Sequence, residues 1–365
     1  MSIEIIGSNI RLARLFNGLS LAELGEKLDK SKQYLSRIET GVEPVSASLE
    51  QALVEHLDIL PEFLRKVDPM PLTEEQCHFR KQLTTKVALR QYARARGEML
   101  KRLVCVLDEY LELPEYNISE VDPISAESIE RGAEACRLAW GLGWGPISNV
   151  IRVAENAGAI VMQVSGLANE VDAVSFATRR PVIALNNKGR SACRARFGVA
   201  HEIGHFALHI GVLTGDRLTE TQANRFASAF LLPRASFLSE SHRALRGTRI
   251  NWDYMSELKQ RWGVSKAALL YRGRQLGVFT DDQVRAGYIT LNRHGEAVEE
   301  REDVFMPVER PEVVNDGLRV MTNELGVPLA AVARKMCVQP RLLNELLGNS
   351  LQTNGTNVVN FLGAM

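Results

Sequence analysis

A five-residue motif, His201-Glu202-Ile203-Gly204-His205, constrains the fold of this 365-residue chain more than any other feature. Two histidines four positions apart lie on the same face only if the segment is helical, because four residues make about one helical turn. In that arrangement both imidazoles can bind one zinc ion, and Glu202 can reach the water on that metal. Zinc lowers the pKa of bound water to about 7, so a neighbouring carboxylate can take its proton. The motif therefore predicts a helix that carries two zinc ligands, His201 and His205, and a catalytic base, Glu202.

A third protein ligand has to come from elsewhere, since a catalytic zinc ion usually has three. Glu220 is the strongest candidate, because it follows His205 by fifteen residues, a gap that allows a turn and a second helix from Thr219. Asn224 would lie one turn after Glu220 on the same face and could support the site. His209 is less suited, because an ideal helix carries it away from a tetrahedral site that already uses the first two histidines.

An HExxH match also arises by chance on a helix that simply buries two hydrogen-bonded histidines. Three features favour a metal site here. The flanking sequence FGVAHEIGHFALH is apolar, as a buried catalytic helix requires, Gly204 lets another element pack closely, and the expected ligand helix follows at short range. We therefore interpret the motif as a zinc site.

Two features near the motif leave alternatives open. The apolar run 181–186 predicts a strand, which is either an edge strand to which an extended substrate adds or an ordinary core strand. An electrophile beside the metal would help to stabilise an oxyanion. His242 and Tyr271 are candidates for that role, and nothing in the spacing selects between them.

The first 66 residues contain the signals of several short helices. We expect helices over 9–17, 21–28, 32–39 and 48–57 and a short fifth helix from Pro61. Ser20 and Glu23 form a capping box before the second helix, and Ser31 caps the third. This is the pattern of a five-helix domain with a helix-turn-helix, whose second helix would enter the major groove of DNA.

The recognition helix would begin with exposed polar residues. Ser31 and Lys32 could contact phosphates, Gln33 could pair with adenine, and Arg37 lies one turn further on. Tyr34 completes the predicted DNA-binding set. The net charge gives little support for DNA binding. Residues 1–66 hold eight Lys and Arg and ten Asp and Glu, and eight minus ten gives minus two, whereas a DNA-binding domain usually has a basic patch. A helix-turn-helix that binds protein is the alternative.

Residues 74–112 predict one long helix with a basic face. Between 76 and 103 it holds one acid and eight basic residues, which could neutralise phosphates or form a solvated face.

Further on we expect helices over 125–142, 147–158, 195–209, 219–231, 252–262 and 266–276, with strands over 159–164 and 181–185. The tail from about 283 would hold strands, then helices near 312–325 and 329–335. The fold class is thus mainly α with a small β-sheet (α+β).

Bulk composition excludes several classes of protein. Lys plus Arg equals Asp plus Glu, at 44 each, so the whole-chain charge says nothing about partners. The five cysteines are odd in number and lack CxxC spacing, which indicates reduced thiols in a cytoplasmic protein. The N-terminus does not resemble a signal peptide, and no run reaches the roughly 18 apolar residues of a membrane span.

Two stretches resemble known families. Residues 8–60, with the segments SLAELGEKL and YLSRIETG, resemble the Xre/Cro-type repressor helix-turn-helix. Residues from about 135 to 280 resemble the ImmA/IrrE family of metallopeptidases, through VIALNNKGRSACRARFGVAHEIGHFALH, ETQANRFASAFLLP and SELKQRWGVSKAALLYRGRQLG. The second resemblance implies a zincin-like domain in which His201, His205 and Glu220 bind zinc and Glu202 is the catalytic base. Known members cleave helix-turn-helix repressors.

These observations divide the chain into four regions: a DNA-binding domain (1–68), a basic linker helix (69–122), a zinc peptidase domain (123–282) and a C-terminal region of unassigned role (283–365). We expect a transcription regulator that binds a double-stranded DNA operator, as a homodimer, and cuts a repressor, another regulatory protein or itself. The alternatives are a non-enzymatic regulator whose peptidase-like domain senses a ligand or partner, and an antitoxin. Glu202 argues against the first of these alternatives, because zinc binding alone does not need it.

Overall fold

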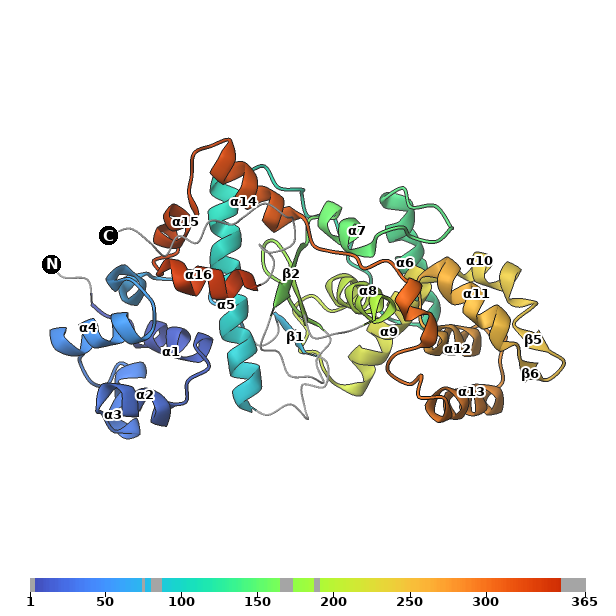
Figure 1. Ribbon diagram of the computed structural model, residues 1–365, viewed down its shortest axis with the longest axis horizontal. Coiled ribbons are helices and arrows are strands. Elements are labelled where there is room, and N and C mark those ends of the chain that lie inside the picture. Colours follow the sequence, from blue (N-terminus) through green and yellow to red (C-terminus); the bar gives the residue numbers. More distant parts are fainter. Residues whose placement is uncertain (1–3, 74–75, 80–86, 165–172, 187–190, 349–365) are drawn as a thin grey trace.

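The computed structural model describes residues 4–73, 76–79, 87–164, 173–186 and 191–348. Figure 1 shows an elongated molecule with the N-terminal helices at one end, a long helix, α5 (Val87–Tyr110), beside them, and a sheet and further helices beyond it. The predicted α+β class is confirmed. No helix in the described part of the chain is long and apolar enough to cross a membrane.

The N-terminal domain consists of five short helices, close to the predicted bounds. They are α1 (Gly7–Phe16), α2 (Leu21–Leu28), α3 (Lys32–Glu39), α4 (Ala47–His56) and the 3-10 helix η1 (Pro61–Arg65). The Ser20–Glu23 capping box is formed, and the Ser31 side chain accepts from the backbone N–H of Tyr34. Arg14 pairs with Glu39 across the buried centre, which ties the first helix to the third.

The expected single helix over 74–112 is wrong. Cys77–Phe79 instead forms a strand, β1, and α5 begins only at Val87; Arg80, Lys81 and Lys86 lie outside the described residues. The strand forms because it extends the edge of the sheet, a long-range pairing that local helix propensity cannot reveal.

Two of the basic residues of α5 do not belong to a solvated face, whereas Arg94 is exposed and Arg90 is half-buried. Arg96 and Arg102 are buried, and their guanidinium groups lie over the rings of Phe16 and Phe63, at 4.9 and 4.4 Å from the ring centroids. A buried guanidinium cannot reach a phosphate. These two cations therefore fasten α5 to the N-terminal domain through cation–π contacts.

A four-stranded mixed sheet, in the order β1-β3-β4-β2, forms the centre of the molecule. Its other strands are β2 (Ile160–Val164), β3 (Ala173–Phe176) and β4 (Val182–Asn186). β2 runs parallel to β4, whereas β3 is antiparallel to both β4 and β1. The edge-strand interpretation of 181–186 is wrong, because β4 lies between β2 and β3. Sequence analysis missed β3 altogether.

Alternate residues of the strands face two different cores. Val174, Phe176 and Val182 pack into the core shared with α5 and the N-terminal domain, whereas Ala173 and Ile183 pack into the core of the peptidase-like region. This follows from the two-residue period of a strand. The second core is built by α6 (Ala126–Ala139), α7 (Val150–Asn156), α8 (Ala192–Leu208), α9 (Arg217–Leu231), α10 (Arg234–Ser241), α11 (Trp252–Trp262), α12 (Lys266–Gln275) and the hairpin β5 (Leu245–Arg246) and β6 (Arg249–Ile250).

The C-terminal region returns to the N-terminal end of the molecule. Strands were expected from about 283, but within the described tail α13 (Asp281–Arg293) and the 3-10 helix η2 (Arg301–Phe305) stand there instead. The predicted later helices are confirmed as α14 (Val313–Asn323) and α15 (Leu329–Lys335), and α16 (Pro340–Leu347) follows. These three pack on α5, and Ile59 forms a β-bridge with Val338 (Figure 1).

A buried carboxylate attaches this tail to α7. Glu155 accepts hydrogen bonds from the backbone N–H groups of Glu312 and Val313, each at 3.1 Å, where α14 begins. Burial raises the pKa of Glu155 to about 7, although the two hydrogen bonds act in the opposite direction. The folded chain therefore binds more protons than the unfolded chain between pH 4.5 and about 7.

We predict that this group's contribution to stability is present below pH 4.5 and is lost as the pH rises to about 7. The free energy of unfolding should fall by up to about 3 kcal/mol across that window, at about 1.4 kcal/mol per pK unit. Glu155→Gln keeps an acceptor for both N–H groups but cannot ionise, so its denaturant midpoint should depend less on pH. Equal pH dependence of the wild type and the variant would contradict the assignment.

Candidate metal centre

The helix that carries the HExxH motif, α8, is held between the sheet and α9 (Figure 1). Ser191 caps its first turn, and its residues from Val199 onward are buried. Gly204 allows α9 to come close, because a Cβ atom there would meet the carbonyl of Ala223 and the side chain of Phe226 at 3.2 Å. This close approach brings the first turn of α9, with Glu220, next to the motif.

The structure brings together the three side chains that the sequence predicts as ligands. His201 Nε2 lies 3.0 Å from His205 Nε2, and Glu220 oxygens lie 3.4 Å from the first and 3.3 Å from the second. A tetrahedral zinc ion with ligands at about 2.0–2.2 Å separates its ligand atoms by about 3.3 Å. The three groups can therefore hold a metal ion with little rearrangement.

The other nitrogen of each imidazole indicates which tautomer is present. His201 Nδ1 lies 3.0 Å from Asn224 Oδ1, an acceptor, so it carries the proton. His205 Nδ1 lies 3.0 Å from His209 Nδ1, and His209 Nε2 lies 2.9 Å from Gln222 Oε1. The amide oxygen of Gln222 requires the proton on His209 Nε2, so His205 donates to His209. Both Nε2 atoms then present lone pairs to each other, an arrangement that a cation stabilises.

The ionisation states also suit a cation. Burial lowers the pKa of His205 to about 3, so this imidazole is neutral near pH 7. Glu220 Oε1 is buried and has no hydrogen-bond partner among the described residues. The neutral imidazole of His205, a second imidazole beside it and a carboxylate with an orphaned oxygen together fit a divalent metal ion.

Glu202 lies beside these groups and is oriented by the sheet. Its Oε2 accepts a hydrogen bond from the hydroxyl of Ser175, on β3, and both residues are fully buried. Sequence analysis did not find Ser175, because nothing in the short run Ala173–Phe176 distinguishes it from a loop. Asn224, in contrast, was identified from its one-turn spacing after Glu220.

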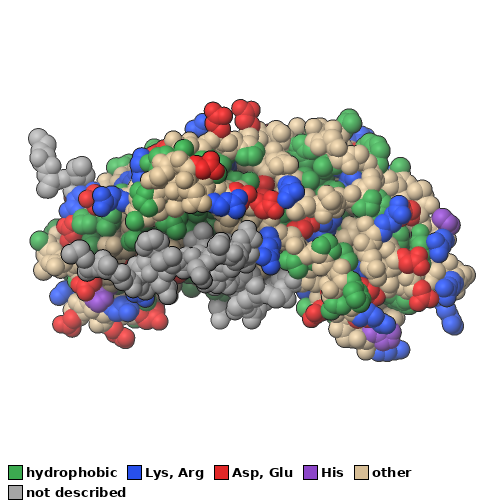
Figure 2. Space-filling view, turned by 45° about the horizontal axis from the view of Figure 1, so that its top comes forward, with side chains coloured by type: hydrophobic (Ala, Val, Ile, Leu, Met, Phe, Trp, Pro, Cys, Tyr) green, Lys and Arg blue, Asp and Glu red, His purple; other side chains and the backbone are tan. Residues whose placement is uncertain are grey.

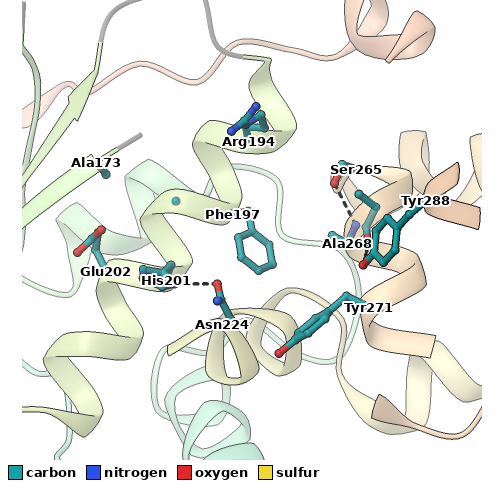
Figure 3. Close-up of a pocket in the computed structure, with 12 residues that line it drawn as sticks. Ala173, Arg194, Phe197, His201, Glu202, Asn224, Ser265, Ala268, Tyr271 and Tyr288 are labelled. Carbon is teal, nitrogen blue, oxygen red and sulfur yellow. Dashed lines mark hydrogen bonds between the residues drawn. The ribbon is translucent and has the colours of Figure 1, made fainter. Parts of the chain in front are cut away.

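A cleft with a cavity volume of about 270 Å³ opens onto this centre (Figure 3). Phe197, Tyr271 and Tyr288 give it an aromatic wall, and Gly198 leaves its floor open, because no described atom lies within 4 Å of where a Cβ would stand. The remaining lining residues are Ala173, Arg194, His201, Glu202, Asn224, Ser265, Ala267 and Ala268. The cleft can therefore receive an apolar side chain next to Glu202.

The two candidates for the oxyanion-stabilising residue differ in position. Tyr271 lines the cleft, on the side opposite His201 (Figure 3). His242 is exposed, hydrogen-bonds the carbonyl of Ser239 and does not line the cleft. Of these two residues, Tyr271 is therefore the one that a substrate in the cleft can approach.

The predicted DNA-reading residues lie along the exposed side of α3. Ser31, Lys32, Gln33 and Arg37 are exposed, and Tyr34 is half-buried. Ser31 uses its hydroxyl to cap the helix, which leaves its backbone at the position where a phosphate would approach. The first turn of the helix is thus accessible to a major groove.

Local charge around α3 is balanced rather than basic. Arg37 forms a 2.7 Å ion pair with Glu43 on the surface. On the face shown in Figure 2, Lys and Arg side chains are interspersed with Asp and Glu. The net charge of this domain therefore adds little attraction for phosphates.

Two parts of the chain match models of known protein families. Residues 10–64 match the helix-turn-helix family model, and residues 154–273 match the model of the IrrE N-terminal-like domain. No curated protein matches the chain. The second match includes α8, α9 and the cleft residues up to Tyr271. The chain therefore joins an Xre-type helix-turn-helix domain to an IrrE/ImmA-like peptidase domain.

Proposed function

We propose that this protein is a DNA-binding transcription regulator whose second domain is a zinc-dependent endopeptidase. The observation that carries the proposal is the set formed by buried His201 and His205 and half-buried Glu220, whose ligand atoms lie within 4.8 Å of one another beside the carboxylate of Glu202. The resemblance to repressor-cleaving peptidases supports a regulatory protein, such as a helix-turn-helix repressor, as the substrate.

The residues of the centre would divide the chemistry as follows. His201, His205 and Glu220 hold the zinc ion, which when bound polarises a carbonyl and acidifies water. Glu202, oriented by Ser175, accepts the proton of the attacking water and can return it to the leaving amine. Because the site is buried, the charge of Glu202 acts in surroundings of low dielectric constant, where its effect is larger than in water.

The cleft supports a peptide substrate with an apolar residue near the cut bond. Its aromatic wall of Phe197, Tyr271 and Tyr288 would bury such a side chain, at a gain of about 25 cal/mol per Å² of apolar surface. Tyr271 can donate a hydrogen bond from its hydroxyl, and burial raises the pKa of that hydroxyl, so it stays protonated near pH 7. We propose Tyr271 as the group that stabilises the oxyanion.

Removal of a ligand should abolish stoichiometric metal binding. We expect His205→Ala and Glu220→Ala to retain far less than one equivalent of zinc after dialysis, as measured by elemental analysis, because two ligands rarely hold a catalytic zinc. His242→Ala is the matched control, since it removes an exposed histidine of the same domain. Full occupancy in His205→Ala would disprove the ligand assignment.

Loss of the base should abolish cleavage but not metal binding. Glu202→Gln is expected to reduce the cleavage rate by about 10²–10⁴-fold while it keeps its zinc, because general-base catalysis contributes that much. The variant should also trap uncut substrate in a pull-down, which would identify it. If the wild type and the variant both leave candidate helix-turn-helix repressors intact while both still regulate a promoter, the domain is a sensor and not an enzyme.

Changes in the recognition helix should weaken operator binding. Gln33→Ala and Arg37→Ala each remove a side chain that can contact a base edge, a contact worth about 1–3 kcal/mol. We therefore expect the dissociation constant for the operator to rise about 5- to 150-fold in a mobility-shift titration at fixed salt. Gln51→Ala, an exposed glutamine on α4, is the control. Unchanged affinity in both recognition-helix variants would exclude α3 as the reading element.

A further inference from the structure

A fourth histidine at the metal centre, besides His201, His205 and His209, comes from outside both matched domains. His78 lies on β1, in the segment between residues 64 and 154. In the antiparallel pairing of β1 with β3, His78 stands opposite Ser175, the residue whose hydroxyl holds Glu202. The segment that follows the DNA-binding domain thus brings an imidazole to the peptidase centre.

His78 is in contact with one predicted ligand and with the loop between the two ligand helices. It is 1% exposed, and its ring is stacked on that of His205, with 4.9 Å between the centroids and 5° between the planes. Phe206 meets the same ring edge-on at 6.0 Å. His78 Nδ1 lies 2.9 Å from the hydroxyl of Thr214, which precedes α9.

Two other roles for His78 fit less well. It is absent from the described residues whose ligand atoms converge within 4.8 Å, and it does not line the cleft, so it neither binds the metal in this arrangement nor meets substrate. It is not an ordinary buried histidine held by hydrogen bonds at both nitrogens, because its Nε2 has no partner among the described residues. The contacts that hold His78 are the one to the hydroxyl of Thr214 and the stacking on the His205 ring.

That contact adds to the restraint that the hydrogen bond places on His205. The bond from His205 Nδ1 to His209 resists rotation of the imidazole about its Cβ–Cγ bond, but it acts at one edge of the ring only. A ring stacked on its face resists the same rotation, and so keeps the Nε2 lone pair directed at the space between His201 and Glu220. Groups behind a ligand commonly change metal affinity by about 10- to 100-fold.

We propose that His78 is a positioning residue of the metal centre, supplied by the segment between the two domains, which holds the His205 imidazole in its metal-binding orientation by stacking on it. The inference rests on the ligand assignment given under the proposed function. The pairing of β1 with β3 in this register places residue 78 against His205 of α8.

The test compares full-length variants for zinc affinity, by competition with a chromophoric chelator, and for the absorption spectrum of the Co²⁺-loaded protein. His78→Ala should weaken zinc binding by about 10-fold or more and alter the Co²⁺ bands, because His205 loses its restraint. His78→Phe keeps an aromatic ring against His205, so its affinity should recover to within about threefold of the wild type. Circular dichroism checks that each variant is folded.

Thr214→Val provides a second measurement should His78→Ala fail to fold. It leaves the stacked ring in place but removes the hydroxyl that orients it, and we expect a smaller loss of affinity, about threefold. His205→Ala separates the two proposals. If it still binds zinc stoichiometrically, the ligand assignment itself is wrong.

Two results would overturn the positioning role while the ligand assignment survived. In one, His205→Ala loses the metal but His78→Ala binds zinc as tightly as the wild type with unchanged Co²⁺ bands. In the other, a folded His78→Phe is as weak as His78→Ala, which would mean that stacking is not what His78 contributes.

Discussion

The rest of the site depends on one constraint, which is that two buried imidazoles and a half-buried carboxylate are forced close together. Each Nδ1 is committed to a hydrogen bond, so the facing Nε2 lone pairs of His201 and His205 repel each other at 3.0 Å. Glu220 adds a negative charge to the same small space. Folding of the metal-free chain must therefore work against this repulsion, and a divalent cation converts it into the strongest local attraction. The buried helix contacts around Gly204 are what keep these groups from moving apart.

The sheet determines which parts of the molecule can influence this centre. Its strands separate two apolar cores, and one side faces α8 while the other faces α5. Gly97 on α5 is in contact with Phe176 of β3 so closely that a Cβ atom would lie 2.5 Å from the ring. The next residue back along β3, Ser175, points the opposite way and holds Glu202. A displacement of α5 would thus move the strand that orients the carboxylate of Glu202.

The helical half of the site could be predicted from the sequence, because its information is local. The i, i+4 spacing of the two histidines and the short gap to Glu220 fix their proximity once the helices are assumed, and Asn224 follows by the same spacing. Ser175 and His78 could not be found in this way. Each reaches α8 only through strand pairing between distant segments, and β1 lies in a stretch whose local pattern favours a helix. The single helix expected over 74–112 failed for that reason, and its buried arginines, Arg96 and Arg102, were taken for a possible phosphate-binding face.

The first apolar core also determines how the N-terminal domain is connected to the sheet beside the candidate metal centre. It runs without interruption from Ile10 through α5 and one side of the sheet to Leu347, so the DNA-binding domain is not tethered by a free linker. Moving that domain as a rigid body would expose apolar surface at about 25 cal/mol per Å². A second connection between α5 and the sheet runs through residues 68–73, which lead toward β1. Lys101 on α5 binds Asp68 and the carbonyl of Met70, and Glu98 accepts from the backbone N–H of Leu72. Leu72 and Cys77 belong to the same core, so a change in the packing of α5 against this core would be passed on to β1, which carries His78.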